Sequence, residues 1–368
     1  MTNNIGEWIQ NIKKDKVDQV SIFCHDDPDP DCISSALGMG ALLTKHKIHY
    51  KIYYGGELAH IQNRVFINVL NINMNRINGD INEDVKKAIS NNPIIIVDTS
   101  CVPGSGNLRP LINYIPEDKK IDIIIDHHSN NDIKESDRFG SHSIYIKREC
   151  GACATLVHEI LVENKVKIDS ILATALYFGI ENDTNNFRIE YTSEEDRYSY
   201  DKLEKKIDNK LLSRIISYPL PKGLLKLQKK ALETLEEIGD MLVVGVGFIL
   251  PSQKSWMADV ANNLIRHDTV NHVCVMGVID DGIGIPKKLA ASLRTTGDVI
   301  NTKEFIQTIF GQDFGGKKGA GAGAMVLDDS VTEKVDMMRD DAVKYETEFN
   351  SIYNGYVIAL KKEKEKIS

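Results

Sequence analysis

The sequence predicts an α/β protein whose N-terminal domain is a doubly wound, mainly parallel sheet, followed by a smaller mixed α/β domain. Three observations support this fold. Strand-like runs alternate with helical patterns through the first half of the chain. Two of those runs, 93–97 and 121–125, are apolar apart from Asp122, as buried central strands of parallel sheets are. A charged segment broken by Pro219 and Pro221 then precedes a second region of mixed character.

The remaining elements follow from periodicity and from flanking turn residues. In the first half, strands are predicted at 17–23 and 49–54, and helices at 33–45, 58–70, 152–164 and 170–180. In the second half, strands are predicted at 241–250 and 273–279, and helices at 256–267, 303–309 and from 332 onward. The predicted divisions are a first domain at 1–192, a helical connector at 193–239, a second domain at 240–345 and a helical tail at 346–368.

Composition excludes some classes of protein. The 368 residues carry a net charge of −8, which argues against a protein that coats nucleic acid through bulk positive charge. No apolar run approaches the roughly 20 residues that span a bilayer, and residues 1–16 do not resemble a signal sequence. We therefore expect no membrane association and a cytoplasmic location. Cys150 and Cys153 form a CxxC pair, which is interpreted as small apolar residues at a helix start rather than as a zinc or redox site.

The densest polar cluster is the segment 24–32, Cys-His-Asp-Asp-Pro-Asp-Pro-Asp-Cys, between the first predicted strand and a helix. Ligands of open α/β sheets bind at the carboxyl ends of the strands, where this loop lies. Its four carboxylates repel one another unless cations neutralise them, and His25, Asp29 and Asp31 could supply three ligands to a metal pair. In a purely structural alternative, Asp31 caps the helix that begins at Ile33. The loop alone fits both interpretations.

Similar residues recur at other predicted element ends. Asp98 ends one apolar strand, Asp126, His127 and His128 end the next, and Asp183 follows a helix. A dinuclear site of about six ligands needs such a dispersed supply of acids and imidazoles. Oxygen and imidazole ligands suit Mn²⁺ or Mg²⁺ better than a thiolate-preferring metal. The recurrence therefore favours a pair of divalent cations.

The pattern His25-x3-Asp29-x-Asp31, Asp98, Asp126-His127-His128 and Asp183 resembles the DHH phosphoesterase superfamily between about residues 17 and 190. That group contains RecJ-type exonucleases, family II inorganic pyrophosphatases, exopolyphosphatases and phosphatases of short oligoribonucleotides and pAp. The resemblance implies two Mn²⁺ ions, with Mg²⁺ or Co²⁺ as alternatives, and attack by a bridging water or hydroxide. One ion is held by His25, Asp29 and Asp98, and the other by Asp31, Asp98, His127 and Asp183. Asp126 is implied to orient His127, and His128 to meet the scissile phosphate or the leaving oxygen.

The second half resembles the DHH-associated domain that closes over substrate. The residues that carry this resemblance are Arg294, Gly315, Gly316, Lys317 and Gly319. They are expected to form a phosphate-binding loop with a nearby guanidinium. Lys317 stands where relatives usually carry histidine, and a tight helix–strand junction is the structural alternative. Arg188 sits where the short-oligonucleotide branch has a Phe-Arg pair near the site.

Three functions remain in view. The first is Mn²⁺-dependent hydrolysis of short oligoribonucleotides, linear dinucleotides or pAp; the net negative charge suits short ligands, because long strands need extended basic tracks. The second is inorganic pyrophosphatase or exopolyphosphatase activity. The third is a non-catalytic nucleotide-binding regulatory module. A short oligonucleotide or nucleotide is the expected partner, and a homodimer is expected because relatives of this layout are often dimers.

Overall fold

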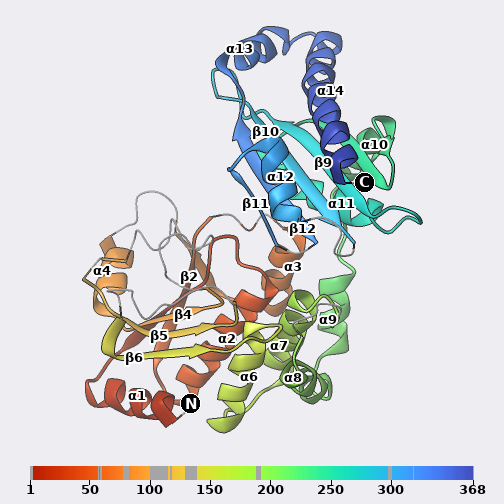
Figure 1. Ribbon diagram of the computed structural model, residues 1–368. Coiled ribbons are helices and arrows are strands. Elements are labelled where there is room, and N and C mark those ends of the chain that lie inside the picture. The colour runs from red at the N-terminus through yellow and green to blue at the C-terminus, as the bar shows by residue number, and fades with distance from the viewer. Residues whose placement is uncertain are drawn as a thin grey trace. The chain divides into compact units, whose positions relative to one another are not determined.

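A computed structural model describes residues 3–56, 58, 60–77, 83–99, 115, 116, 118–128, 139–187, 192–296, 301–317 and 319–367. The chain divides into two compact units, residues 1–218 and 219–368, each with its own sheet (Figure 1). No described helix is long and apolar enough to cross a membrane. The two units are described separately below.

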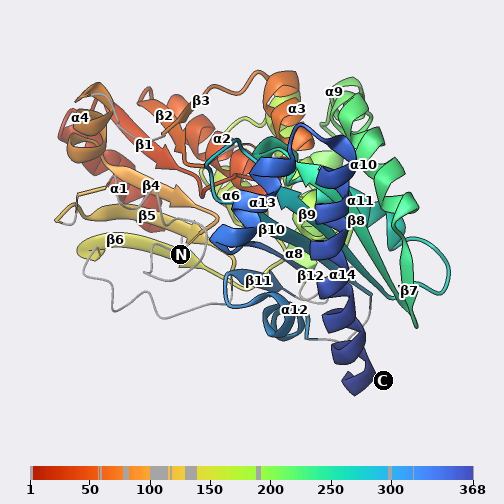
Figure 2. The same cartoon turned by 90° about the horizontal axis from the view of Figure 1, so that it is seen from above.

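The first unit contains a six-stranded sheet in which every strand pair is parallel. The spatial order is β3 (Met74–Arg76), β2 (His49–Tyr54), β1 (Gln19–Phe23), β4 (Ile94–Val97), β5 (Ile121–Asp126) and β6 (Phe139–Lys147). Figure 2 shows β1, β4, β5 and β6 side by side. The order reverses between β1 and β4, which is where ligands of doubly wound sheets bind. The predicted α/β class and parallel sheet are confirmed.

Helices cover both faces of this sheet. They are α1 (Asn3–Lys14), α2 (Pro30–Lys45), α3 (Ile61–Leu70), α4 (Glu83–Asn91), α6 (Cys153–Glu163), α7 (Ser170–Asp183), α8 (Glu194–Glu204) and α9 (Asn209–Ile216). On one face, Ile95 and Ile123 pack in a core with α1, α2, α6 and α7. On the other face, Ile94 and Ile124 pack against Ile89 of α4. Burial on both faces explains why β4 is apolar throughout and why β5 is apolar from Ile123 to Ile125.

The division between the units falls within the segment predicted as a connector, residues 193–239. Helices α8 and α9 are part of the first unit, whereas α10 (Lys222–Glu233) and β7 (Glu236–Ile238) are part of the second. The first unit ends at Tyr218, beside Pro219, which is consistent with a break at the Pro219–Pro221 pair. The helical character of the segment is therefore present, but its helices are divided between the two units.

The second unit contains a mixed sheet flanked by helices, as predicted. Its strand order is β11 (Phe314–Lys317), β12 (Ala320–Val326), β10 (Lys288–Thr295), β9 (His272–Ile279), β8 (Met241–Ile249) and β7. The β8–β9 pair is parallel and the other pairs are antiparallel. The remaining helices are α11 (Trp256–Leu264), α12 (Thr302–Phe310), α13 (Asp329–Met338), α14 (Ala342–Ile367) and the short 3₁₀ turn η3 (Pro251–Gln253). Helices α10 and α11 pack on one face of the sheet, and α12 and α14 pack on the other.

An ion pair fastens the last helix to the sheet of this unit and gives a pH prediction. The ammonium of Lys364, on α14, lies 2.9 Å from Asp240 Oδ1 and holds the pKa of Asp240 at about 2. A depressed pKa stabilises the fold above the unfolded value of about 3.9, and the stabilisation is lost as pH falls toward 2. Because the Asp240 side chain is 35% exposed, we expect Lys364→Ala to cost only about 0.5 kcal/mol of unfolding free energy.

Urea unfolding at pH 6 and at pH 2 measures this contribution. The difference between the wild type and Lys364→Ala should be present at pH 6 and nearly absent at pH 2. Lys362→Ala, at an exposed position two residues earlier on the same helix, is the control. Its difference in unfolding free energy from the wild type should not change between pH 6 and pH 2. A difference that stays constant between the two pH values would contradict the assignment.

Candidate metal centre

The sequence-predicted ligands in the first unit converge at the carboxyl edge of its sheet. His25, Asp98 and His127 follow β1, β4 and β5, which are neighbouring parallel strands. The other three come from helices at the same edge: Asp29 is the N-cap of α2, Asp31 lies in its first turn, and Asp183 ends α7. A parallel sheet brings the carboxyl ends of its strands together, so residues far apart in sequence become neighbours.

His127 occupies the most informative position in this cluster. Its Nε2 lies 3.2 Å from Asp98 Oδ1, 3.3 Å from Asp183 Oδ2 and 3.8 Å from Asp31 Oδ2. Its Nδ1 lies 2.9 Å from the carbonyl oxygen of Cys150. A carbonyl can only accept, so Nδ1 carries the proton, and in the neutral ring Nε2 directs a lone pair at the three carboxylates. Burial opposes protonation of Nε2, but the surrounding carboxylates raise the pKa of His127, so these acceptors are satisfied either by a proton on Nε2 or by a metal cation between them.

His25 has the same arrangement on the other side of Asp98. Its Nδ1 lies 2.7 Å from the carbonyl oxygen of Asp26, so Nε2 faces Asp98 Oδ2 at 3.5 Å and Asp29 Oδ1 at 3.9 Å. Donation of the second ring N–H to a backbone carbonyl is typical of metal-ligating histidines. The two oxygens of Asp98 therefore face different imidazoles, as a bridging carboxylate requires. Asp98 has a φ of +59°, a conformation in which backbone strain is often associated with function.

Burial makes this cluster costly without a cation. His25, Asp31, Asp98 and His127 are all buried, and Asp98 Oδ1 and His127 Nε2 have no hydrogen-bond partner among the described residues. Burial, and then the charge of Asp98, raise the pKa of Asp31 well above its ordinary value. Although burial opposes ionisation of Asp98, its contacts with His127 and His25 hold its pKa well below the usual range. Divalent cations bound by these carboxylates and imidazoles fit the orphaned atoms.

The sequence of the loop fitted either metal ligation or helix capping, and the structure gives Asp29 and Asp31 different hydrogen-bond partners. Asp29 Oδ1 accepts the N–H of Cys32 at 3.0 Å and caps α2. Asp31 does not cap α2. Its two oxygens accept the N–H groups of Cys153 and Ala154, both at 2.7 Å, at the start of α6. The structural alternative is therefore wrong for Asp31, whereas Asp29 does act as a helix cap. Cys153, the second cysteine of the CxxC pair, is the first residue of α6 and is a buried free thiol, as the sequence predicted.

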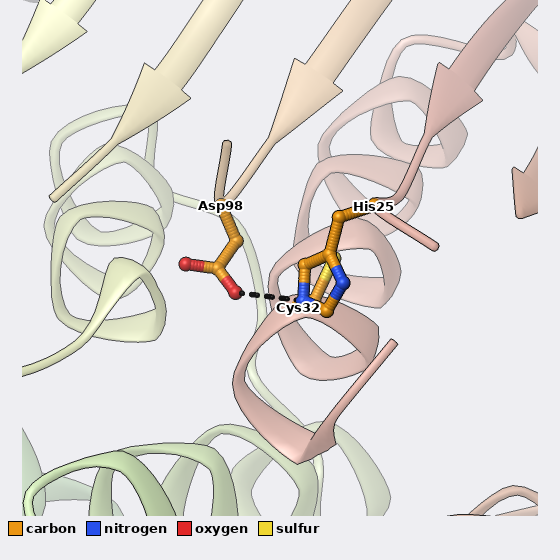
Figure 3. A group of neighbouring side chains, drawn as sticks. All are labelled: His25, Cys32 and Asp98. Carbon is orange, nitrogen blue, oxygen red and sulfur yellow. Dashed lines mark ion pairs between the residues drawn. The ribbon is translucent and has the colours of Figure 1, made fainter. Parts of the chain in front are cut away.

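A thiol to which the sequence analysis gave no role lies beside the first histidine. Cys32 offers a sulfur that lies within 4.8 Å of ligand atoms of His25 and Asp98, and all three residues are buried. Figure 3 shows Asp98 directed at the imidazole of His25, with the Cys32 side chain next to that ring. The sulfur also donates to the carbonyl of Val97 at 3.6 Å. The signal available in the sequence was its place directly after Asp31.

Asp126 contacts a different histidine from the one expected. Its Oδ1 lies 2.7 Å from Nδ1 of His128 and accepts the backbone N–H of His128 at 3.2 Å. His127 is instead oriented by the Cys150 carbonyl. The expectation that Asp126 orients His127 is therefore wrong, because the two rings, whose centroids lie 4.3 Å apart, have different hydrogen-bond partners. His128 is half exposed, which leaves its ring accessible from the edge of the sheet.

The expected substrate residues are placed differently by the structure. Arg188 lies outside the described residues. The other five, Arg294, Gly315, Gly316, Lys317 and Gly319, all lie in the second unit. Arg294 is on β10, where its Nε donates to Asn262 Oδ1 at 2.7 Å and burial lowers the pKa of the guanidinium.

The glycine-rich segment that was expected to be a loop forms part of a β-hairpin instead. Gly315, Gly316 and Lys317 belong to strand β11, which pairs antiparallel with β12. Gly319, at φ +80°, lies in the turn that joins the two strands and favours glycine there. The alternative of a tight helix–strand junction is also wrong for these glycines, because the junction between α12 and β11 lies at residues 311–313. The glycines therefore serve an edge hairpin.

Close helix packing next to the metal centre gives a second prediction. A Cβ on Gly179, in α7, would lie 2.3 Å from Ser34 Oγ and 3.2 Å from the Cα of Asp31 in α2. We expect Gly179→Ala to lower the free energy of unfolding by about 1–3 kcal/mol through overpacking. Gly6→Ala is the matched control, because no atom lies within 4 Å of its Cβ in helix α1, and it should stabilise by about 0.5–1 kcal/mol. Urea unfolding of both variants tests this, and equal stability of Gly179→Ala and the wild type would contradict it.

Comparison with known proteins agrees with this geometry. Residues 19–180 match the DHH family, N-terminal domain. The first unit therefore contains a region similar to the N-terminal domain of the DHH family. The chain is 28% identical over 320 residues to the uncharacterized protein MJ1633 of Methanocaldococcus jannaschii, covering 87% of this chain and 60% of that protein. It is 27% identical over 176 residues to the bifunctional oligoribonuclease and PAP phosphatase NrnA of Mycoplasma pneumoniae, covering 48% and 49% of the two chains.

A solved structure matches across both units. The crystal structure of an exopolyphosphatase-related protein from Bacteroides fragilis has a TM-score of 0.66 and 16% sequence identity, covering 95% of this chain and 97% of that one. At this identity the likeness shows the fold alone. The chain spans three-fifths and about half of the lengths of its two relatives. The match of residues 19–180 agrees with the phosphoesterase class expected from the sequence.

Proposed function

We propose that this protein is an Mn²⁺-dependent phosphoesterase that hydrolyses short oligoribonucleotides, linear dinucleotides or pAp. The observation that carries the proposal is the pair of imidazoles, His25 and His127, whose Nε2 atoms face the two oxygens of Asp98. The proposed ligands are His25, Asp29 and Asp98 for one ion, and Asp31, Asp98, His127 and Asp183 for the other. A cytoplasmic location and a homodimer complete the proposal.

The chain's own residues have definable tasks in this reaction. Two bound divalent cations supply an activated water and neutralise phosphoryl charge. The backbone carbonyls of Asp26 and Cys150 fix the tautomers of His25 and His127, so that both Nε2 atoms can ligate. Asp126 fixes the ring of His128, which is accessible to a substrate phosphate or to a leaving oxygen that needs a proton.

One observation supports nucleotide substrates over inorganic phosphates, and another supports short substrates over long strands. NrnA of Mycoplasma pneumoniae, which this chain resembles over 176 residues, is named an oligoribonuclease and PAP phosphatase. The net charge of −8 suits short substrates, because long strands are held by extended basic tracks. Mn²⁺ is chosen because all six proposed ligands are carboxylates or imidazoles.

A substrate panel tests the proposal. The full chain is stripped with a chelator and assayed on pApA, short RNA, pAp, pyrophosphate and polyphosphate after addition of Mn²⁺, Mg²⁺ or Co²⁺. We expect no turnover in the stripped protein, and turnover of pApA or pAp restored best by Mn²⁺. Hydrolysis of pyrophosphate or polyphosphate alone would replace the substrate assignment. Uptake of Mn²⁺ without any turnover would point to a nucleotide-binding module.

A further inference from the structure

The segment 150–155, at the start of α6, hydrogen-bonds to two ligands of one proposed cation site and packs against the residue that follows the third. The carbonyl of Cys150 accepts from His127 Nδ1, and the N–H groups of Cys153 and Ala154 donate to Asp31. The third contact is steric: a Cβ on Gly151 would lie 2.5 Å from Thr184 Cγ2, so the segment abuts the residue that follows Asp183. Asp31, His127 and Asp183 form one compact group of ligand atoms, all within 4.8 Å of one another.

A carboxylate that is not one of these three ligands accepts hydrogen bonds from residues of the segment 150–155. Asp196, in the first turn of α8, is fully buried. Its Oδ2 accepts the N–H of Gly151 at 2.6 Å, and its Oδ1 accepts the hydroxyl of Thr155 at 2.5 Å. Oδ2 also accepts the N–H and hydroxyl of Ser193, which caps α8. One side chain thus ties the start of α8 to the start of α6, and Figure 1 shows α6, α7 and α8 side by side.

The other ligands are held by other groups. His25 is oriented by the carbonyl of Asp26, and Asp29 by the N–H of Cys32, so neither depends on residues 150–155 through a described hydrogen bond. Asp98 directly follows β4, and its backbone N–H donates to the carbonyl of Ile125 on the neighbouring strand β5. The contacts of Asp196 are therefore directed at one side of the centre.

We propose that Asp196 is a positioning residue for the cation site formed by Asp31, His127 and Asp183. This inference rests on the proposed two-cation function. Without the carboxylate, Gly151 and Thr155 lose their hydrogen bonds to residue 196. The neighbouring carbonyl of Cys150, which fixes the tautomer of His127, and the N–H groups of Cys153 and Ala154, which hold Asp31, are then less firmly positioned. Removal of such a supporting partner typically costs about 10–100-fold in metal affinity. The site that contains His25 and Asp29 keeps its own support.

Titration with Mn²⁺ alone tests the proposal. Calorimetry, together with the electron paramagnetic resonance signal of free Mn²⁺, counts the bound ions in the full chain. We expect two ions in the wild type. In Asp196→Ala, one ion should bind about 10–100-fold more weakly while the other is unchanged. Asp196→Asn should retain most of the affinity, because its amide oxygen can still accept from Gly151 and Ser193 while the Thr155 hydroxyl turns to accept from its nitrogen.

Matched variants separate positioning from general destabilisation. Asp169 also caps a helix, α7, by accepting the N–H of Leu172 at 2.9 Å, but it lies at the opposite end of that helix from Asp183. Asp169→Ala should lose about 1 kcal/mol of stability and no Mn²⁺ affinity. Should Asp196→Ala fail to fold, Thr155→Val decides, since it removes only one of the four contacts and should weaken the same ion.

The outcomes distinguish the two proposals. A wild-type protein that binds no Mn²⁺ overturns the proposed function. Two ions bound with wild-type affinity in Asp196→Ala, or in Thr155→Val if that variant must decide, overturn the positioning role and leave the function standing. Equal weakening of both ions also overturns it, because the contacts reach one ligand group only.

Discussion

Replacing Asp98 by asparagine is expected to lower turnover of pApA or pAp by about 10³-fold or more, because it removes charge stabilisation from both cation sites at once. The two oxygens of Asp98 lie 3.5 Å and 3.2 Å from the Nε2 atoms of His25 and His127. An asparagine of the same shape points its NH2 group at one of the two imidazoles, where it would donate to the Nε2 lone pair that should ligate a cation. Steady-state kinetics at saturating Mn²⁺, with a parallel count of bound ions, measures the effect.

Asp122→Asn provides the control for this substitution. Asp122 is also an aspartate of the parallel sheet, but it lies near the start of β5, where it accepts from Trp8 Nε1 at 3.2 Å and from the N–H of Ile94 at 2.9 Å. Its replacement should affect stability only, and both Mn²⁺ binding and turnover should remain. Wild-type turnover in Asp98→Asn would remove Asp98 from the centre and with it the bridging role.

The central strands and the clustered ligands were predictable for the same physical reason. Strands β4 and β5 are buried on both faces, so their sequences are apolar apart from Asp122, and the polar residue that follows each apolar run marks the carboxyl edge. Once the strands are parallel and adjacent, Asp98 and His127 must lie near one another. The convergence of residues from distant parts of the chain thus followed from local patterns and one topological rule.

The missed elements lack such a local signal. Strand β6 mixes serine and histidine with its apolar residues, and β3 has only three residues. The hairpin of β11 and β12 is built from glycine and alanine, which are depleted in strands, so its sequence suggested a loop. Its pairing is determined by the neighbouring strand β10, a contact between segments that periodicity does not report.

The partners of individual polar side chains were less predictable than their location. Asp126 precedes two adjacent imidazoles, and only the backbone direction at the end of β5 decides which of them it reaches. Asp196 lies in a charged stretch, 193–239, in which the sequence marked no single acid, yet it is fully buried with four hydrogen bonds. Burial of one acid among many exposed ones depends on tertiary packing, which a single sequence does not show.

His128→Gln is expected to reduce kcat by about 10²–10⁴-fold, the usual contribution of a positioned acid or base, while two Mn²⁺ ions still bind. Two arrangements are possible for this residue, because a nitrogen of its ring lies close enough to Asp98 and His127 to form a ligand group with them. The nitrogen that lies 3.9 Å from Asp98 is Nδ1, and Asp126 Oδ1 engages that same atom at 2.7 Å. The ring is then fixed with Nε2 available, and half of the side chain is exposed, which suits contact with substrate rather than with a cation. Loss of a bound ion in His128→Gln would instead make His128 a ligand, and Asp126 the group that orients it for ligation.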